Sequence, residues 1–186
     1  LTFTDLAPTG EAVARLADER VLVPGGIPGE RARVALLPPG PGRPRGRLLE
    51  LLVPSPERVV PRCRHAAECG GCDWQHIAYP AQLRYKQRLV QALLRQALGP
   101  EAPEVALTLG LAPQAGGPAG DGAPWGFRQK VAFAFAPGPE GRGLVMGHYA
   151  RGTHDVIPVE ECPVHAERGN AVAFALYDEL RRTRLP

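Results

Sequence analysis

Apolar and polar residues alternate in short runs over the first sixty positions of the chain. An alternation of period two is typical of half-buried β-strands. Clusters of proline and glycine at residues 8–10, 24–26 and 38–42 separate the runs and favour turns. The pattern predicts five strands that form a small β-barrel, at residues 1–6, 10–16, 20–23, 30–37 and 45–53.

A proline pair follows the last of these strands, in the sequence Pro54-Ser55-Pro56. Proline cannot continue a central strand and stiffens a short connection. We therefore place a domain boundary after residue 58, which gives a barrel domain at residues 1–58 and a second domain at residues 59–186.

The second domain shows both periodicities. Residues 79–98 have a helical period, with an apolar face that includes Leu83, Val90 and Leu93. Residues 127–135 alternate like a strand, and two further strands are expected at residues 143–149 and 153–157. A second helix is expected from Pro163 to about Arg182, with an inner face of Val172, Leu176 and Leu180. The predicted fold class is α+β: a β-barrel, then a small α/β domain with an antiparallel sheet and two helices.

Candidate metal ligands gather in the segment between the barrel and the first helix. Cys63, Cys69 and Cys72 have five and two residues between them, and Gly70-Gly71 lets the backbone turn tightly there. A site with four thiolates would need the remaining cysteine, Cys162, about ninety residues further on. A triplet plus one remote cysteine is commoner in iron–sulfur proteins than in zinc sites, which usually use two short pairs of ligands.

Zinc, disulfides and free thiols remain alternatives for these four cysteines. Disulfides would suit an oxidising compartment, but residues 1–6 include no basic region and no apolar run of signal-peptide length. We therefore expect a cytoplasmic protein. No apolar stretch approaches the twenty residues that a transmembrane helix needs, so no membrane association is expected. His65 and His76 are interpreted as groups beside the cysteine loop, and the other histidines as ordinary polar residues.

The formal net charge of +3 is too small to identify a partner, but its distribution is informative. Residues 61–100 carry six cations and two anions, a net charge of +4, and only two of the chain's 22 cations are lysines. Arginine suits phosphate recognition because its guanidinium is planar and forked. A bias in composition towards Gly, Ala, Pro and Arg explains the arginines equally well.

Alternating cations share strand faces in three places, which predicts contacts with single-stranded nucleic acid. Solvated arginines on half-buried strands are the alternative. Trp74, next to the cysteine loop, could stack on a base or shield a cluster from solvent. The candidate cations for nucleic-acid binding are Arg31, Arg33, Arg43, Arg45, Arg47, Arg128 and Lys130.

Several local motifs together resemble one family. They are Phe3-Thr4-Asp5-Leu6-Ala7, Gly29-Glu30-Arg31, Pro54 to Arg58, the triplet from Cys63 to Cys72, Tyr79 to Gln87, Phe127 to Val131, and Glu161-Cys162-Pro163. The chain resembles the S-adenosylmethionine-dependent RNA (uracil-5-)-methyltransferases, in the iron–sulfur branch that modifies 23S ribosomal RNA. The resemblance implies that the barrel is an OB-like TRAM domain that binds RNA. It also implies that Cys63, Cys69, Cys72 and Cys162 hold a [4Fe-4S] cluster.

The sequence departs from that family in its catalytic parts. The family's methyl-donor domain, with its cysteine nucleophile and glutamate base, has no counterpart here, because every cysteine is assigned to the cluster and no dinucleotide-type glycine motif follows a strand. We expect the chain to be the RNA-recognition front of a larger methyltransferase, monomeric and inactive alone. S-adenosylmethionine would bind only in the missing domain. Ribosomal RNA is favoured over transfer RNA; a tRNA (uracil-5-)-methyltransferase fragment and a stand-alone RNA-binding protein with a zinc or cluster site are the alternatives.

Overall fold

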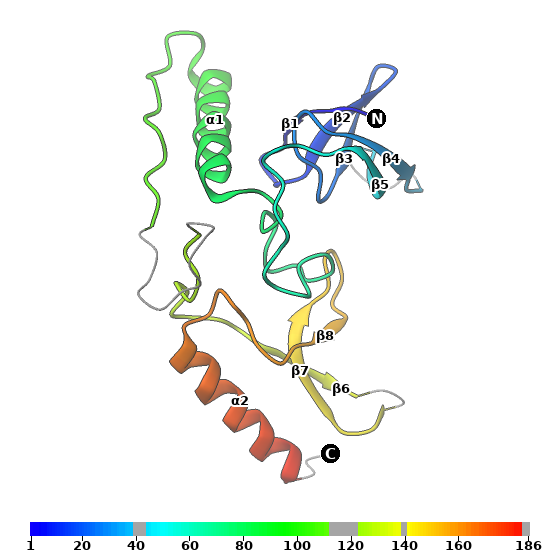
Figure 1. The fold of residues 1–186 in the computed structure, drawn as a ribbon, viewed down its shortest axis with the longest axis vertical. Helices are drawn as coiled ribbons and strands as arrows, with labels where there is room; N and C mark the ends of the chain where they lie inside the picture. The colour runs from blue at the N-terminus through cyan, green and yellow to red at the C-terminus, as the bar shows by residue number, and fades with distance from the viewer. Residues whose placement is uncertain (39–43, 112–122, 139–140, 184–186) are drawn as a thin grey trace. The chain divides into compact units, whose positions relative to one another are not determined.

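The computed structural model describes residues 1–38, 44–111, 123–138 and 141–183, and Figure 1 traces its helices and strands. The chain forms two compact units. Unit 1 consists of Leu1–Val60 and Asp73–Gly110, and unit 2 consists of Pro61–Cys72 and Leu111–Pro186. The fold class is α+β, as predicted, with three small antiparallel sheets and two helices among the described residues.

Five strands of unit 1 lie within two residues of their predicted positions. The strands β1 (Phe3–Leu6), β2 (Ala12–Leu16) and β3 (Glu19–Val23) form one antiparallel sheet, and β4 (Arg31–Leu36) and β5 (Gly46–Val53) form another. The β2–β3 hairpin pairs Val13 with Leu22, and the β4–β5 pair has two register shifts. Apolar side chains from both sheets fill one core, because alternate residues of each strand point to the same face.

The structure differs from one continuous five-stranded sheet, because the described strands form two sheets. Isolated bridges connect them at both edges: Thr2 pairs with Arg31 in antiparallel orientation, and Leu22 pairs with Arg45 in parallel orientation. The amide of Leu22 also donates a hydrogen bond to the carbonyl of Pro44 at 2.9 Å. The two sheets therefore meet edge to edge around a shared core.

A buried ion pair ties the loop before β4 to the segment after β5. The fully buried carboxylate of Glu30 accepts hydrogen bonds from Nε and Nη2 of Arg58, at 2.6 and 2.7 Å. Backbone amides of Ile27 and Ser55 donate to the same carboxylate, at 2.9 and 3.1 Å. Burial by itself raises the pKa of Glu30, but these four hydrogen bonds and the charge of Arg58 outweigh it, so the pKa lies below its ordinary value.

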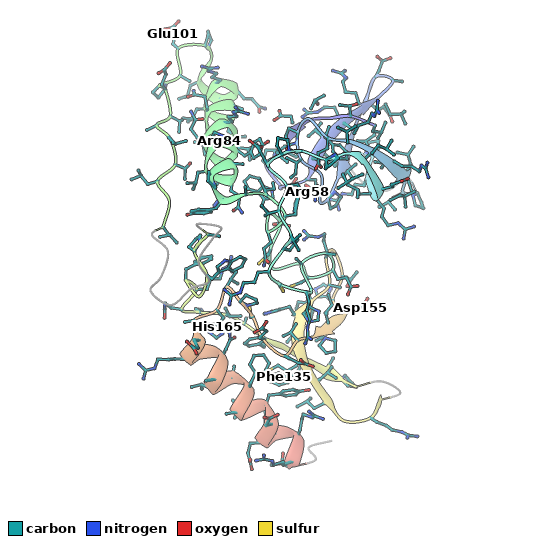
Figure 2. All side chains as sticks on the ribbon, in the orientation of Figure 1. Arg58, Arg84, Glu101, Phe135, Asp155 and His165 are labelled. Carbon is teal, nitrogen blue, oxygen red and sulfur yellow. The ribbon has the colours of Figure 1, made fainter. Side chains whose placement is uncertain are left out.

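The neighbouring Glu57 attaches the first helix, α1 (Tyr79–Leu98), to the same segment. Its carboxylate accepts hydrogen bonds from the hydroxyl of Tyr85 and from Nη2 of Arg84, both at 2.5 Å. Burial and the hydrogen bond to Glu57 raise the pKa of Tyr85 to about 12, so this hydroxyl remains a donor at neutral pH. Arg58 and Arg84 are labelled in Figure 2.

The buried face of α1 is not the predicted one. Ala81, Tyr85 and Leu89, spaced by four residues, pack against the strand core, whereas Val90 and Leu93 are exposed. Tyr85 was not counted as an inward residue, yet it buries its ring and places its hydroxyl on Glu57. A tyrosine with a polar partner is favourable at such a position because both of its ends are satisfied. The helix ends at Leu98 and is capped by Gly99, whose φ of 85° favours glycine.

This packing division differs from the predicted boundary after residue 58. Ile77, Ala81 and Tyr85 belong to the same core as Phe3 and Val23, so α1 packs with the strands of unit 1. Residues 61–72, with the cysteine triplet, fall in unit 2 instead. Among the residues that the structure describes, no helix is long and apolar enough to cross a lipid bilayer.

Unit 2 contains the third sheet and the second helix. Its strands are β6 (Ala134–Pro137), β7 (Leu144–Tyr149) and β8 (Val156–Pro158), with β7 in the centre, followed by α2 (Glu167–Arg182). The prediction of a strand at residues 127–135 is mostly wrong, because β6 begins only at Ala134. Arg128 instead pairs with the turn before α2: its amide donates to the carbonyl of Val164, and its carbonyl accepts from the amide of Ala166.

The inner face of α2 also differs from the prediction. Leu180 is half-buried as predicted, but Val172 and Leu176 are 70% and 58% exposed. Phe174 and Tyr177 are half-buried instead. Phe174 packs edge-on against Phe133 at 5.5 Å, and the hydroxyl of Tyr177 donates to the carbonyl of Leu144 at 2.8 Å. The helix begins at Glu167 rather than Pro163 because residues 162–166 form a separate turn.

Replacement of Arg58 by methionine should lower the free energy of unfolding of unit 1 by about 3–5 kcal/mol, because Glu30 would stay buried without its cation. Denaturant unfolding in a Trp125→Phe background tests this, since Trp74 is then the single tryptophan and lies in unit 1. Arg33→Met is the matched control. Its ion pair with Glu50 is exposed, so it should cost about 0–1 kcal/mol. An equal loss of unfolding free energy in Arg58→Met and Arg33→Met would contradict the importance of the buried ion pair.

The pH dependence of Glu30→Gln follows from the lowered pKa. A carboxyl whose pKa is lower in the folded than in the unfolded protein stabilises the fold above its ordinary value of 4.5. That contribution is lost as the pH falls through the folded-state pKa. The difference in unfolding free energy between the wild type and Glu30→Gln should therefore be constant at neutral pH and shrink below pH 4.5. A difference that grows on acidification would contradict this.

Candidate metal centre

All four cysteines lie in unit 2, on segments far apart in the sequence. Cys63, Cys69 and Cys72 come from the loop at residues 61–72, and Cys162 from the turn before α2. None of them forms a disulfide; Cys69 is buried and the other three are half-buried. The predicted ligands are therefore brought into one compact unit, and their ligand role stays a prediction.

Backbone amides near three of the four cysteines favour negative sulfur. The amide of Gly71 donates to Sγ of Cys69 at 3.4 Å. The backbone amide of His65 acts to lower the pKa of Cys63, and those of Val164 and His165 act to lower the pKa of Cys162, against the larger effect of burial. Hydrogen bonds of this kind favour the thiolate over the thiol, and they are among the features that tune thiolate-bound clusters.

The thiols also influence one another electrostatically. Burial raises the pKa of Cys63, and the nearby Cys69 and Cys72 raise it further. Burial likewise raises the pKa of Cys162, with added contributions from Cys72 and Cys63. Four thiolates in one region repel each other, so their joint ionisation needs a bound cation. The described residues do not form a closed set of three or more ligands around one point.

Hydrogen bonds fasten the cysteine loop to the turn that follows β7. The amide of Gly70 donates to the carbonyl of Tyr149 at 3.0 Å, and the amide of Arg151 donates to the carbonyl of Glu68 at 2.8 Å. A side chain at Gly70 would lie 3.2 Å from that Tyr149 carbonyl, so this glycine permits a close backbone approach. Nη2 of Arg151 donates to the carbonyls of Cys69 and Cys72. Sequence reasoning missed Arg151, which is about eighty residues away from the loop.

A second set of contacts fixes the turn at Cys162. Asn170 donates from Nδ2 to the carbonyl of Cys162 at 2.9 Å, and its Oδ1 lies 3.1 Å from Nδ1 of His165. His165 is buried, so its interpretation as an ordinary polar residue was wrong. Figure 2 shows it at the start of α2. No sequence pattern marked Asn170, because its partners lie in a turn whose shape was not predicted.

An aromatic group connects this turn to the sheet. The ring of Phe133 stacks on His148 at 4.9 Å and lies 6.0 Å from His165. Burial lowers the pKa of His148, and the nearby His165 and His65 lower it further, so this imidazole is neutral at neutral pH. Its Nε2 is buried without a hydrogen-bond partner among the described residues.

The predicted RNA-binding cations of unit 1 are exposed, with two of them in ion pairs. Arg31 and Arg33 lie on β4 and Arg47 on β5, while Arg45 precedes β5. Arg33 pairs with Glu50 at 3.2 Å, and Arg45 lies 3.6 Å from the half-buried Glu11. Arg43 lies outside the described residues. Arg31 and Arg47 are therefore the stronger candidates for phosphate contacts.

The remaining candidates have different surroundings from those expected. Arg128 and Lys130 are exposed in unit 2 but precede β6, so no strand places them on a common face. Trp74 is half-buried in unit 1, where its Nε1 donates to the carbonyl of Gly10 at 2.9 Å and its ring meets Tyr85 edge-on at 6.4 Å. The Trp74 ring packs against the strand core, which limits its use as a stacking platform.

Comparison with known proteins identifies relatives, although no protein-family model matches the chain. An uncharacterised RNA methyltransferase of Thermosynechococcus vestitus is 35% identical over 184 residues, which cover 97% of this chain and 38% of that protein. A 23S rRNA (uracil(1939)-C(5))-methyltransferase RlmD of Edwardsiella ictaluri is 32% identical over 185 residues, which cover 99% of this chain and 39% of that protein. This chain is related to the RNA methyltransferases. The resemblance inferred from its motifs is confirmed.

The RNA methyltransferase relatives are much longer than this chain, which spans about two fifths of their length. A solved structure shares the fold: the Pyrococcus abyssi tRNA (uracil-54, C5)-methyltransferase in complex with S-adenosyl-L-homocysteine. It superposes with a TM-score of 0.59 at 21% identity, over 99% of this chain and 37% of that one.

Gly169→Ala tests the packing around the turn at Cys162. A Cβ at this position would lie 2.2 Å from Nε2 of the buried His165, which Asn170 holds in place. Alanine normally stabilises a helix relative to glycine, but here overpacking should lower the free energy of unfolding by about 1–3 kcal/mol. Thermal unfolding is the measurement, and the exposed Arg168→Ala is the control, with an expected change within about 0.5 kcal/mol. A stabilised Gly169→Ala variant would contradict this packing.

Proposed function

We propose that this chain is the RNA-recognition and [4Fe-4S]-binding portion of an enzyme that methylates carbon 5 of a uridine in ribosomal RNA. Its relationship to RNA methyltransferases supports the reaction. The observation that carries the proposal is the gathering of Cys63, Cys69, Cys72 and Cys162 in one compact unit, with none of them in a disulfide. The relative at 32% identity is named for ribosomal RNA, which supports that substrate over transfer RNA.

The four cysteines would supply the four thiolates of the cluster. The amide that donates to Cys69 and the backbone amides that act to lower the pKa of Cys63 and Cys162 fit this role, because they favour negative sulfur. The absence of a closed ligand set in the described part of the chain is compatible with it, since metal-binding free energy commonly completes such sites. Bound there, the cluster would supply structural cross-linking, because methyl transfer to uracil moves no net electrons.

The two sheets of unit 1 are proposed to close as an OB-like TRAM barrel. Bridges from Thr2 to Arg31 and from Leu22 to Arg45 support the strand order β1-β2-β3-β5-β4, with β4 returning to the edge of β1. Small barrels of this type bind single-stranded nucleic acid on a charged face. Arg31, Arg33 and Arg47 on the β4–β5 pair would contact phosphates, with Arg45 at its edge.

By this proposal the chain transfers no methyl group by itself. Adding a nucleophile to carbon 6 of uracil requires a thiolate, and each cysteine is assigned to the cluster. S-adenosylmethionine would bind in a separate domain of the longer enzyme. A monomeric state and a cytoplasmic location stay predictions, as does the functional boundary after residue 58.

Metal analysis after anaerobic purification tests the cluster. We expect about four irons per chain and a similar amount of sulfide. Cys162→Ser should lose the iron, because this ligand alone lies outside the cysteine loop. Glu161→Gln is the matched control: it changes the neighbouring residue, leaves the sulfur in place and should keep the iron. One zinc per chain with negligible iron would overturn the cluster and support the zinc alternative.

The salt dependence of RNA binding tests the strand face. Affinity for a single-stranded RNA oligonucleotide should fall with salt at a slope of about −0.7 per phosphate neutralised. Replacing Arg31 and Arg47 by alanine should flatten the slope by up to about 1.4 units, while weakening different sequences about equally. Arg15 and Arg20, a cross-strand pair of exposed arginines on β2 and β3, form the control pair. An equal change in both double variants would contradict a defined RNA face.

A further inference from the structure

The side chain of Arg151 spans the cysteine loop at a position that no motif marks. It lies in the turn between β7 and β8, and its Nη2 donates to the carbonyl of Cys69 at 3.2 Å and to the carbonyl of Cys72 at 3.0 Å. Its backbone amide donates to the carbonyl of Glu68. One residue thus contacts three positions of a five-residue stretch.

The turn around Arg151 adds further contacts to the same stretch. Ala150 forms an isolated bridge with Cys69, and the carbonyl of Tyr149 accepts from the amide of Gly70. The loop between Cys69 and Cys72 contains two glycines, which by themselves leave its backbone with many conformations. Contacts from the β7–β8 turn therefore select one conformation of the loop, and the guanidinium fixes the carbonyls of both cysteines.

The charge of Arg151 is a second feature with its own consequence. The guanidinium of Arg151 places a positive charge beside the cysteine loop. Four thiolates around an iron–sulfur core leave the site with net negative charge, and one-electron reduction makes that charge more negative. A fixed cation nearby stabilises the reduced form more than the oxidised form.

We propose that Arg151 is a positioning residue for the cysteine loop. Its side chain holds Cys69 and Cys72, through their carbonyls, in the positions that metal ligands need, and its charge offsets the charge of the bound cluster. This inference rests on the proposed cluster for its electrostatic half only. The positioning half concerns the cysteines of the metal-free chain and can be tested without iron.

Two variants separate the effect of the forked guanidinium hydrogen bonds from the effect of the positive charge of Arg151. Arg151→Lys keeps the charge but replaces the planar fork by a single ammonium, and Arg151→Met removes both. The exposed Arg142→Met, in the turn before β7, removes one cation from the same unit and is the matched control. Circular dichroism of each variant establishes that the fold is retained.

The first readout is the rate at which iodoacetamide alkylates each cysteine of the metal-free chain, followed by mass spectrometry of its peptides. Both Arg151 variants should show several-fold faster alkylation of Cys69 and Cys72, with Cys162 little changed, and Arg142→Met should match the wild type. The positioning role would be overturned if each cysteine were alkylated at the same rate in Arg151→Met as in the wild type. This outcome decides the question whether or not the chain binds iron.

The second readout is the cluster's midpoint potential, measured anaerobically with dithionite as the electron donor. Arg151→Met should have a more negative potential than the wild type, while Arg151→Lys and Arg142→Met should stay close to it. Unchanged potential in Arg151→Met would overturn the electrostatic role. A wild-type chain that binds no iron would overturn the proposed cluster together with this electrostatic role, and the alkylation rates would still decide the positioning role.

Discussion

The buried ion pair between Glu30 and Arg58 is the constraint on which unit 1 depends. A fully buried carboxylate is tolerated only when cations and hydrogen-bond donors surround it, and here Arg58 and two backbone amides supply them. Because Arg58 comes after the last strand, satisfying Glu30 fixes where the chain leaves the sheets. Glu57, one residue before it, then receives Tyr85 and Arg84 of α1. One electrostatic requirement in the strands thus determines where the helix attaches.

Unit 2 depends on a different constraint, because it has few large buried side chains among its described residues. Its aromatic group around Phe133 joins the sheet to α2, while hydrogen bonds from Arg151 and Asn170 fix the two cysteine segments. Backbone-directed contacts of this kind define loop shape without adding much buried apolar area. A cross-link through four thiolates would supply the missing stabilisation, which gives the proposed cluster a physical reason in this unit.

Local patterns predicted the five strands of unit 1 well, because alternation is encoded in neighbouring residues. The ligand role of the four cysteines stays a prediction. The helix faces were harder to predict. On α1 the apolar stripe through Val90 and Leu93 proved exposed, since Tyr85 reached a carboxylate that only the folded chain brings near. Arg151 could not be found for the same reason, because its acceptors lie about eighty residues earlier in the chain. Contacts that create a site across long sequence separations leave no periodic signal.

The central claim is that the four cysteines of unit 2 together bind one [4Fe-4S] cluster. Mössbauer spectroscopy of the chain reconstituted with ⁵⁷Fe and sulfide tests it most directly, since the spectrum distinguishes cluster types as well as counting iron. The account predicts the quadrupole doublet of a diamagnetic [4Fe-4S] centre for most of the iron, absent in Cys162→Ser. A spectrum of single iron atoms in four-sulfur coordination, or a Cys162→Ser variant with the wild-type spectrum, would contradict it.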